Sequence, residues 1–141
     1  METLFTNGHL RIERLIVGPL ENNVYVVSNR DDAVIIDAAD EAHRILSAVD
    51  GLKVSSILTT HGHFDHVGAV REVAASLGAP FRLHEADAEL AGLEPDLALA
   101  DEEIIFIGDQ PLVAMHTPGH TPGSMSFLIG EQLFTGDTLF P

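Results

Sequence analysis

The sequence predicts a mixed α/β domain that extends over residues 1–141. Apolar runs of strand length, such as 33–36 and 104–107, alternate with stretches in which apolar residues recur at helical spacing. Gly and Pro residues separate these runs, and we find neither a repeat nor a linker between domains. A chain of 141 residues is long enough to bury one core, although it is short for two packed sheets with outer helices.

The two clearest helices are marked by their apolar faces and by a stop signal. Residues 41–49 place Ile45, Leu46 and Val49 on one face, and residues 67–77 end before Gly78 with Pro80 just beyond. In chain order we expect strands at 10–17, 23–28 and 33–37, a helix at 41–49, a strand at 55–60, a helix at 67–77, a strand at 81–84, a helical stretch at 85–91, an acidic loop to Glu103, and strands at 104–107, 111–116, 124–129 and 132–135.

Three histidines and a carboxylate lie together in residues 59–66, Thr-Thr-His-Gly-His-Phe-Asp-His. Neutral imidazole and carboxylate groups are the ligands that zinc prefers, at about 2.0–2.2 Å. His61 and His63 are two residues apart at the end of an extended segment, so their side chains can reach one ion. Asp65 and His66 follow where a helix is expected to begin, which directs them to a second point nearby. The segment therefore predicts a site for two adjacent metal ions.

A structural role is the alternative interpretation of this segment. Asp65 could be the N-cap of the helix that begins near Val67. A helix start needs only one cap, however, and protonated imidazoles that lie close together repel one another. The metal interpretation is the one that explains all four residues.

Two later segments supply further candidate ligands. His120 lies in residues 117–124, Thr-Pro-Gly-His-Thr-Pro-Gly-Ser, where two Pro-Gly pairs predict a tight loop between strands. Asp137 follows a short apolar run and would lie at a strand end, where its two oxygens can bridge two cations. Taken singly, each could instead be an ordinary loop or turn residue.

The order of these motifs resembles the metallo-β-lactamase superfamily: His-x-His-x-Asp-His at 61–66, the loop at 117–124, and Gly-Asp-Thr-Leu-Phe at 136–140. Residues 18–25 and 34–38 also resemble the branch of hydrolases related to glyoxalase II, the hydroxyacylglutathione hydrolases. The resemblance implies an αββα sandwich, in which two similar halves each contain a sheet covered by helices on its outer face.

The resemblance also implies a ligand set. It assigns His61, His63 and His120 to a first metal ion, Asp65 and His66 to a second, and Asp137 to a bridging position. Zinc is the expected metal, with two ions in a complete site, although iron and manganese accept the same ligands.

The family pattern places one more histidine beyond the segment at 136–140, whereas this sequence stops at Pro141. We therefore expect the second half of the sandwich to be incomplete and the second metal site to lack a ligand. Activity is expected to be lower than that of a complete family member. Apolar residues near residue 140 would leave an unpaired strand edge, which predicts a homo-oligomer formed through the second sheet.

The expected reaction is metal-assisted hydrolysis of a small-molecule substrate. A hydroxide shared by two ions would attack a carbonyl, and Asp65 would orient that hydroxide as well as bind metal. The resemblance points to a thioester of the acyl-glutathione kind or of another small thiol. The alternatives are β-lactam hydrolysis, an iron-dependent persulfide dioxygenase, and a non-catalytic fragment that associates with another chain.

Composition narrows the class of protein. The formal charge is −15 with only seven Lys and Arg residues, which argues against nucleic acid as a partner. There is no cysteine, so disulfides and thiolate ligands are excluded. The first residues lack the features of a signal peptide and no apolar run is long enough to cross a bilayer, so we expect a cytoplasmic protein without a membrane partner.

The remaining histidines have weaker patterns. His9, His43 and His116 fall in expected strands or helices and are interpreted as surface or packed residues. His84 follows a strand and could line the pocket.

Overall fold

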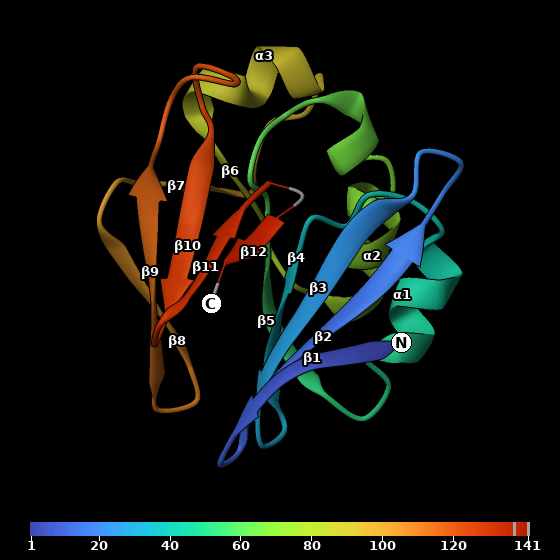
Figure 1. Cartoon of the computed structure of the whole chain (residues 1–141). Helices are drawn as coiled ribbons and strands as arrows, with labels where there is room; N and C mark the ends of the chain where they lie inside the picture. Colours follow the sequence, from blue (N-terminus) through green and yellow to red (C-terminus); the bar gives the residue numbers. More distant parts are fainter. Residues whose placement is uncertain (137, 141) are drawn as a thin grey trace.

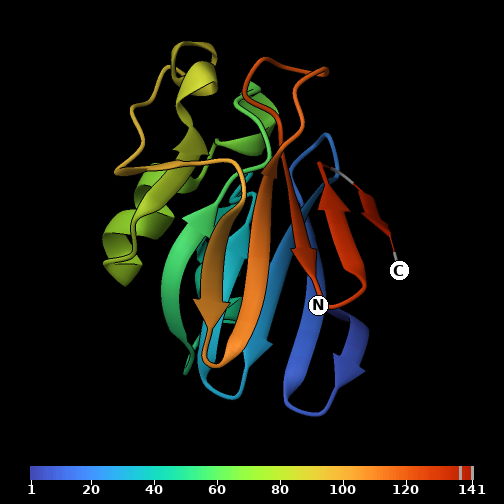
Figure 2. The same cartoon turned by 90° about the vertical axis from the view of Figure 1, so that its left-hand side faces the viewer.

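The computed structural model describes residues 1–136 and 138–140. Two β-sheets face each other, and the helices lie on the far side of the first sheet (Figure 1). The view turned by 90° shows the second sheet in front of the first, with the strands of the two sheets running in similar directions (Figure 2). The described part of the chain therefore forms three layers of the expected αββα sandwich: helices, first sheet and second sheet.

The first sheet has seven strands in the order β1-β2-β3-β4-β5-β6-β7. Strands β1 to β4 pair antiparallel, whereas β4 to β7 pair parallel. The strands are β1 (Glu2–Asn7), β2 (Leu10–Val17), β3 (Asn22–Asn29), β4 (Asp32–Ile36), β5 (Lys53–Leu58), β6 (Phe81–His84) and β7 (Leu97–Leu99).

Helical connections make the parallel half of this sheet possible, because a chain must cross over before it can pair in the same direction. The segment between β4 and β5 contains α1 (Ala42–Ala48). The segment between β5 and β6 contains the 3-10 turn η1 (Phe64–His66) and α2 (Val70–Leu77), and β6 is followed by η2 (Glu85–Asp87) and α3 (Ala88–Ala91). The carboxyl ends of β4, β5 and β6 consequently meet at one edge of the sheet, which is where sites form in parallel sheets.

The second sheet is antiparallel, with the order β12-β11-β10-β9-β8. Its strands are β8 (Glu103–Ile107), β9 (Gln110–His116), β10 (Met125–Ile129), β11 (Gln132–Thr135) and β12 (Thr138–Phe140). The loop between β9 and β10 rises toward the edge at which the parallel strands of the first sheet end (Figures 1 and 2).

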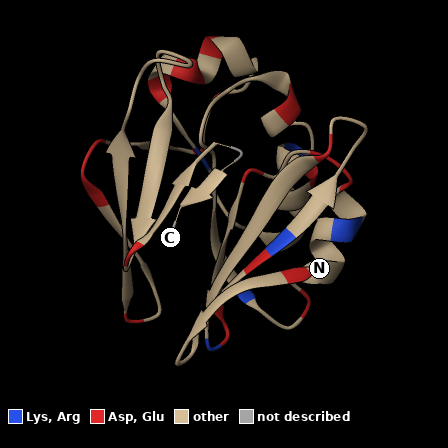
Figure 3. Ribbon diagram, viewed as in Figure 1, with Lys and Arg blue, Asp and Glu red and all other residues tan. Residues whose placement is uncertain are grey.

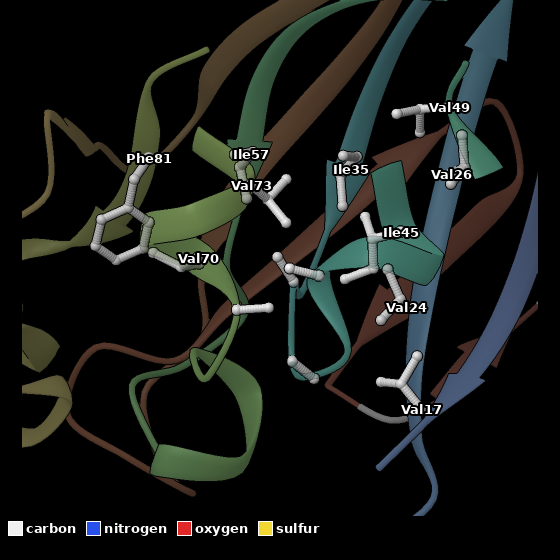
Figure 4. Close-up of a cluster of buried hydrophobic side chains, with 14 of the residues drawn as sticks. Val17, Val24, Val26, Ile35, Ile45, Val49, Ile57, Val70, Val73 and Phe81 are labelled. Atoms are coloured by element: carbon white, nitrogen blue, oxygen red, sulfur yellow. The ribbon is translucent and has the colours of Figure 1, made fainter. Parts of the chain in front are cut away.

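Two hydrophobic clusters hold the layers together. One lies between the helices and the first sheet, where Ile45 of α1 and Val73 of α2 pack on β-strand residues such as Ile35 and Ile57 (Figure 4). The other lies between the two sheets and includes Tyr25, Phe127 and Phe134. The first sheet is thus covered on both faces, which explains why β4 reads as an almost continuous apolar run.

The structure corrects the expected element bounds at the metal motif. The strand expected at 55–60 ends at Leu58, because the backbone N–H of Thr60 donates to Asp37 Oδ1 (2.7 Å) instead of to a neighbouring strand. The helix expected at 67–77 begins only at Val70, since Ala69 N–H bonds to the carbonyl of Ala38. Asp65 lies inside η1 and the N-cap of α2 is Ala69, so the capping interpretation of Asp65 is wrong.

The sequence did not predict β1 or β7, and for β12 it predicted only that apolar residues near residue 140 belong to a strand. Each lies at an edge of its sheet, where few side chains are buried and the apolar signal is weak.

Acidic side chains are distributed over the strands, loops and helices, and the few Lys and Arg residues lie apart from one another (Figure 3). Among the described residues, no helix is long and apolar enough to span a membrane.

Candidate metal centre

Three histidines from two separate loops converge at the edge of the first sheet where the parallel strands β4, β5 and β6 end. One ring nitrogen each from His61, His63 and His120 lies within 4.8 Å of the others. His61 and His63 follow β5 of the first sheet, whereas His120 lies in the loop between β9 and β10 of the second sheet. Both sheets therefore contribute to the site. His61 is buried, His63 is half-buried and His120 is exposed, so the cluster opens to solvent on one side.

His66 adds a fourth imidazole ring to this cluster, next to His61. Its ring centroid lies 4.0 Å from that of His61, and the rings of His63 and His120 lie 5.0 and 4.8 Å from His61. His66 belongs to η1, which turns the chain back toward the end of β5. Four of the predicted ligand side chains are thus brought together.

Buried hydrogen bonds set which nitrogen carries the proton in the rings of His61 and His66. Asp37 Oδ2 lies 2.9 Å from His66 Nδ1, and because a carboxylate only accepts, Nδ1 carries the proton and Nε2 keeps its lone pair. Thr60 Oγ1 donates to the same carboxylate at 2.7 Å and lies 3.1 Å from His61 Nδ1, which leaves Nε2 of His61 free in the same way. Such partners orient metal-binding imidazoles in known metalloproteins.

The protonation state of His61 also favours metal binding. Burial, and then the proximity of His66, lower the pKa of His61 from 6.5 to about 4. His61 is therefore neutral at physiological pH and its lone pair is available to an ion.

Asp65 is placed beside the imidazoles and is held by an amide. Asn22 Nδ2 donates to Asp65 Oδ2 (3.2 Å) and lies 3.5 Å from His66 Nε2. Burial opposes ionisation of Asp65, but the hydrogen bond from Asn22 and the nearby His66 lower its pKa below the ordinary value. Asp65 is therefore an anion with Oδ1 free of this hydrogen bond.

The donor set fits a divalent transition metal, in line with the sequence prediction. Two imidazole nitrogens on one zinc ion stand at most about 4.2 Å apart, given metal–nitrogen distances near 2.1 Å. Nitrogens within 4.8 Å therefore need only a small inward movement to share one ion. The unprotonated Nε2 atoms of His61 and His66, the neutral state of His61 and the anionic Asp65 all agree with this use.

Asp137, the predicted bridging ligand, lies outside the described residues. Its described neighbours Thr135, Gly136 and Thr138 line a cavity of about 350 Å³ together with His61 and His120. A second hollow of about 190 Å³ is lined by Asp65 together with Leu20, Asn22 and Phe64.

Other histidines lie apart from this centre. His9 and His43 are exposed, in agreement with their interpretation as surface residues. His84 is not among the residues that line the cavity beside His61. It stacks on His116 with ring centroids 4.0 Å apart, and His116 Nε2–H donates to the carbonyl of Pro122 at 2.8 Å.

The arrangement has relatives among known proteins. A profile of the metallo-beta-lactamase superfamily matches residues 17–141 of the sequence. The chain belongs to the metallo-β-lactamase superfamily. A hydroxyacylglutathione hydrolase of Anaeromyxobacter dehalogenans (strain 2CP-C) is 40% identical over 121 residues, which are 85% of this chain and 47% of that enzyme. The chain thus spans about half the length of this relative.

Two solved structures of the superfamily resemble the fold closely. The B3 metallo-beta-lactamase BLEG-1 has a TM-score of 0.77 and 33% identity, and TTHA1623 in a di-iron-bound form has a TM-score of 0.77 and 35% identity. In both comparisons 92% of this chain matches 73% of the other. Metal binding is therefore a property of the superfamily that the histidine cluster of this chain supports. Solved relatives include di-iron and di-zinc forms, and the names of the relatives include both a hydroxyacylglutathione hydrolase and a metallo-beta-lactamase.

Sequence reasoning missed three residues that hold the site: Asp37, Asn22 and Asp87. Asp37 and Asp87 are fully buried carboxylates and Asn22 is a buried amide. Asp37 directly follows the apolar strand β4, and this is the same signal on which Asp137 was proposed as a ligand. Asp87 lies just after β6, at the same edge of the sheet.

Proposed function

We propose that this metallo-β-lactamase superfamily chain is a metal-dependent hydrolase of a thioester formed with a small thiol, of the acyl-glutathione kind. The observation that carries the proposal is the convergence of His61, His63 and His120 within 4.8 Å beside the anionic Asp65. The 40% identity to a hydroxyacylglutathione hydrolase supports the thioester class.

The proposed ligands are those that the sequence indicated. His61, His63 and His120 would hold one ion, Asp65 and His66 a second, and Asp137 would bridge the two. When bound, divalent ions supply a Lewis acid for the substrate carbonyl and lower the pKa of water. We propose zinc, with iron and manganese as alternatives that the same ligands accept.

The chain's own residues would orient the reactants. Asn22 holds Asp65 Oδ2, so Oδ1 can accept a hydrogen bond from a water molecule at the centre and direct its lone pair at a carbonyl carbon. Asp37 keeps the proton of His66 on Nδ1, away from the substrate. The exposed apolar side chains of Leu20 and Phe64 border the hollow next to Asp65 and offer a surface for an acyl group. We propose a small molecule as the partner and the cytoplasm as the location.

The test is hydrolysis of an acyl-glutathione thioester by the chain loaded with zinc, manganese or iron in separate preparations. Release of the thiol is followed with a thiol reagent, and Asp65→Asn is the matched inactive variant. Thioester turnover that requires metal and is lost in Asp65→Asn would support the proposal. Absence of turnover with every metal, in protein shown to bind metal, would refute the thioester class.

A β-lactam is the second candidate substrate, because BLEG-1 is a B3 metallo-beta-lactamase of 33% identity. Nitrocefin measured in the same preparations separates the two, and turnover comparable to that on the thioester would favour the β-lactam. Oxygen uptake with glutathione persulfide by the iron-loaded chain would favour a dioxygenase instead.

A further inference from the structure

Asp87 lies close to the metal centre. Its described hydrogen bonds join it to the loops that carry the proposed ligands, and not to the ligand side chains. It ends η2, it is 0% exposed, and it follows β6 at the edge where the site forms. We propose that Asp87 is a positioning residue that joins the two ligand-bearing loops and thereby sets the affinity of the centre for metal. This inference rests on the proposed metal ligands, and it goes beyond them because it assigns the coupling of the two loops to one buried carboxylate.

Three donors from the two loops converge on this carboxylate. Gly62 N–H donates to Oδ2 at 2.8 Å, and Thr121 Oγ1–H donates to the same oxygen at 2.5 Å. Gly123 N–H donates to Oδ1 at 2.7 Å. Gly62 stands between His61 and His63, while Thr121 directly follows His120. Hydrogen bonds to an ionised acceptor are among the stronger ones in proteins, so Asp87 holds backbone on both sides of the histidine cluster.

The backbone approaches Asp87 so closely at Gly62 and Gly123 that neither position has space for a side chain. A Cβ atom on Gly62 would lie 2.7 Å from the carbonyl oxygen of Asp87, and one on Gly123 would lie 2.7 Å from its Cγ. These glycines are required here by the close approach and not by a left-handed backbone. A shift of Asp87 would therefore displace the backbone of both loops.

The link matters because the two loops belong to different sheets. Gly62 follows β5 of the first sheet, and Gly123 precedes β10 of the second. A backbone bond from Met125 N–H to the Thr60 carbonyl (2.7 Å) ties the same segments at one point, and Asp87 adds the side-chain connection beside the ligands. An ion needs its ligands at fixed separations, so a looser connection lowers affinity even when each ligand is intact.

Asp87→Asn tests the inference with little change in volume. The amide presents N–H₂ where one oxygen stood, so at least one loop N–H loses its acceptor. We expect the affinity for Zn²⁺, measured by competition with a chelator, to fall by about 10–100-fold, the range found for outer-shell partners. We expect the visible absorption of the Co²⁺-loaded chain to change, and amide hydrogen exchange at Gly62 and Gly123 to accelerate in the metal-free chain.

Two control variants separate positioning from general destabilisation. Val73→Ala opens a cavity in the helix-covered core, and Asp96→Asn alters a carboxylate that accepts Phe81 N–H far from the ligands. Both should keep the wild-type Zn²⁺ affinity and Co²⁺ spectrum. Unchanged affinity and spectrum in Asp87→Asn would overturn the inference, as would an equal loss of affinity in Val73→Ala at matched thermal stability.

The readouts also separate this inference from the proposed reaction. A wild-type chain that binds Zn²⁺ but hydrolyses no thioester would remove the substrate proposal and leave the role of Asp87 standing. A wild-type chain that binds neither Zn²⁺ nor Co²⁺ would overturn the metal centre and this inference together.

Discussion

Asp37 Oδ2 accepts the Nδ1 proton of His66 at 2.9 Å, and both side chains are buried. The same carboxylate accepts the backbone N–H and the hydroxyl of Thr60, at 2.7 Å each. One residue at the end of β4 thus fixes both the ring of His66 and the turn that leads into the histidine motif.

Asp37→Ala should impair both stability and metal binding. It leaves the backbone N–H and hydroxyl of Thr60 and Nδ1–H of His66 without this acceptor, and a buried donor without a partner costs about 1–3 kcal/mol. We expect a lower urea midpoint and a metal content below that of the wild type. Asp32→Ala, an exposed carboxylate on the same strand, is the control. A wild-type metal content in Asp37→Ala would show that His66 is oriented without this bond.

Metal content should distinguish a histidine of the cluster from a histidine outside it. We expect His120→Ala to lose at least one ion per chain, because it removes one of the three converging nitrogens. His9→Ala should keep the wild-type content, since His9 is exposed and is not part of the cluster. Mass spectrometry of protein without an added histidine tag measures both. Equal metal content in the two variants would contradict the ligand assignment of His120.

Asn22→Ala should lower activity while leaving all the proposed ligands in place. The substitution removes the amide that donates to Asp65 Oδ2. Because this hydrogen bond lowers the pKa of Asp65, the pKa should be higher in the variant. We expect kcat/KM on the thioester to fall about tenfold, the lower end of the range for outer-shell partners. Asn23→Ala, one position along the same strand, is the control. A change in kcat/KM equal to that of Asn23→Ala would show that Asn22 does not position Asp65.

The stacked pair His84 and His116 predicts a pH response. Burial, and then the nearby His116, lower the pKa of His84 below 6.5, although Asp87, Asp101 and Glu85 oppose this. The unfolded chain therefore binds this proton more readily than the folded chain, so His84 should contribute a loss of stability as pH falls below 6.5. An NMR titration of the His84 ring should give a midpoint below that of the same ring in the urea-unfolded chain, and a higher or equal midpoint would refute it. In His116→Gln the midpoint should rise.

Association through the second sheet stays a prediction, and we propose a second copy of the chain as the partner. An apolar row crosses four strands, because Ile104 pairs with Val113, Val113 with Leu128, and Leu128 with Leu133. Ile104 at the end of this row is 56% exposed. Light scattering should show a dimer that Ile104→Glu weakens and that Leu90→Glu, exposed on α3, does not. A strictly monomeric wild type at high concentration would refute this.

The sequence predicted most strands, both longer helices and the grouping of the histidines, because these depend on local patterns. Apolar runs mark β2 to β4. The spacing of His61, His63 and His66 places three imidazole rings in one short segment after β5. The missed strands β1 and β7 have few buried residues and depend on the edge of the sheet to which they are added. No local pattern identifies Asp87, whose partners at Gly62 and Gly123 are brought to it only by the packing of two sheets.

The division of the ligands between two sheets has a thermodynamic consequence. His61 follows β5 and His120 follows β9, so the three-histidine cluster exists only when the sheets are packed together. A ligand that binds only the folded state stabilises it by mass action, by about 2.7 kcal/mol at a hundredfold excess over Kd. Metal bound at this place would act as a cross-link across the sandwich, so the availability of metal would govern the persistence of the folded chain as well as its chemistry.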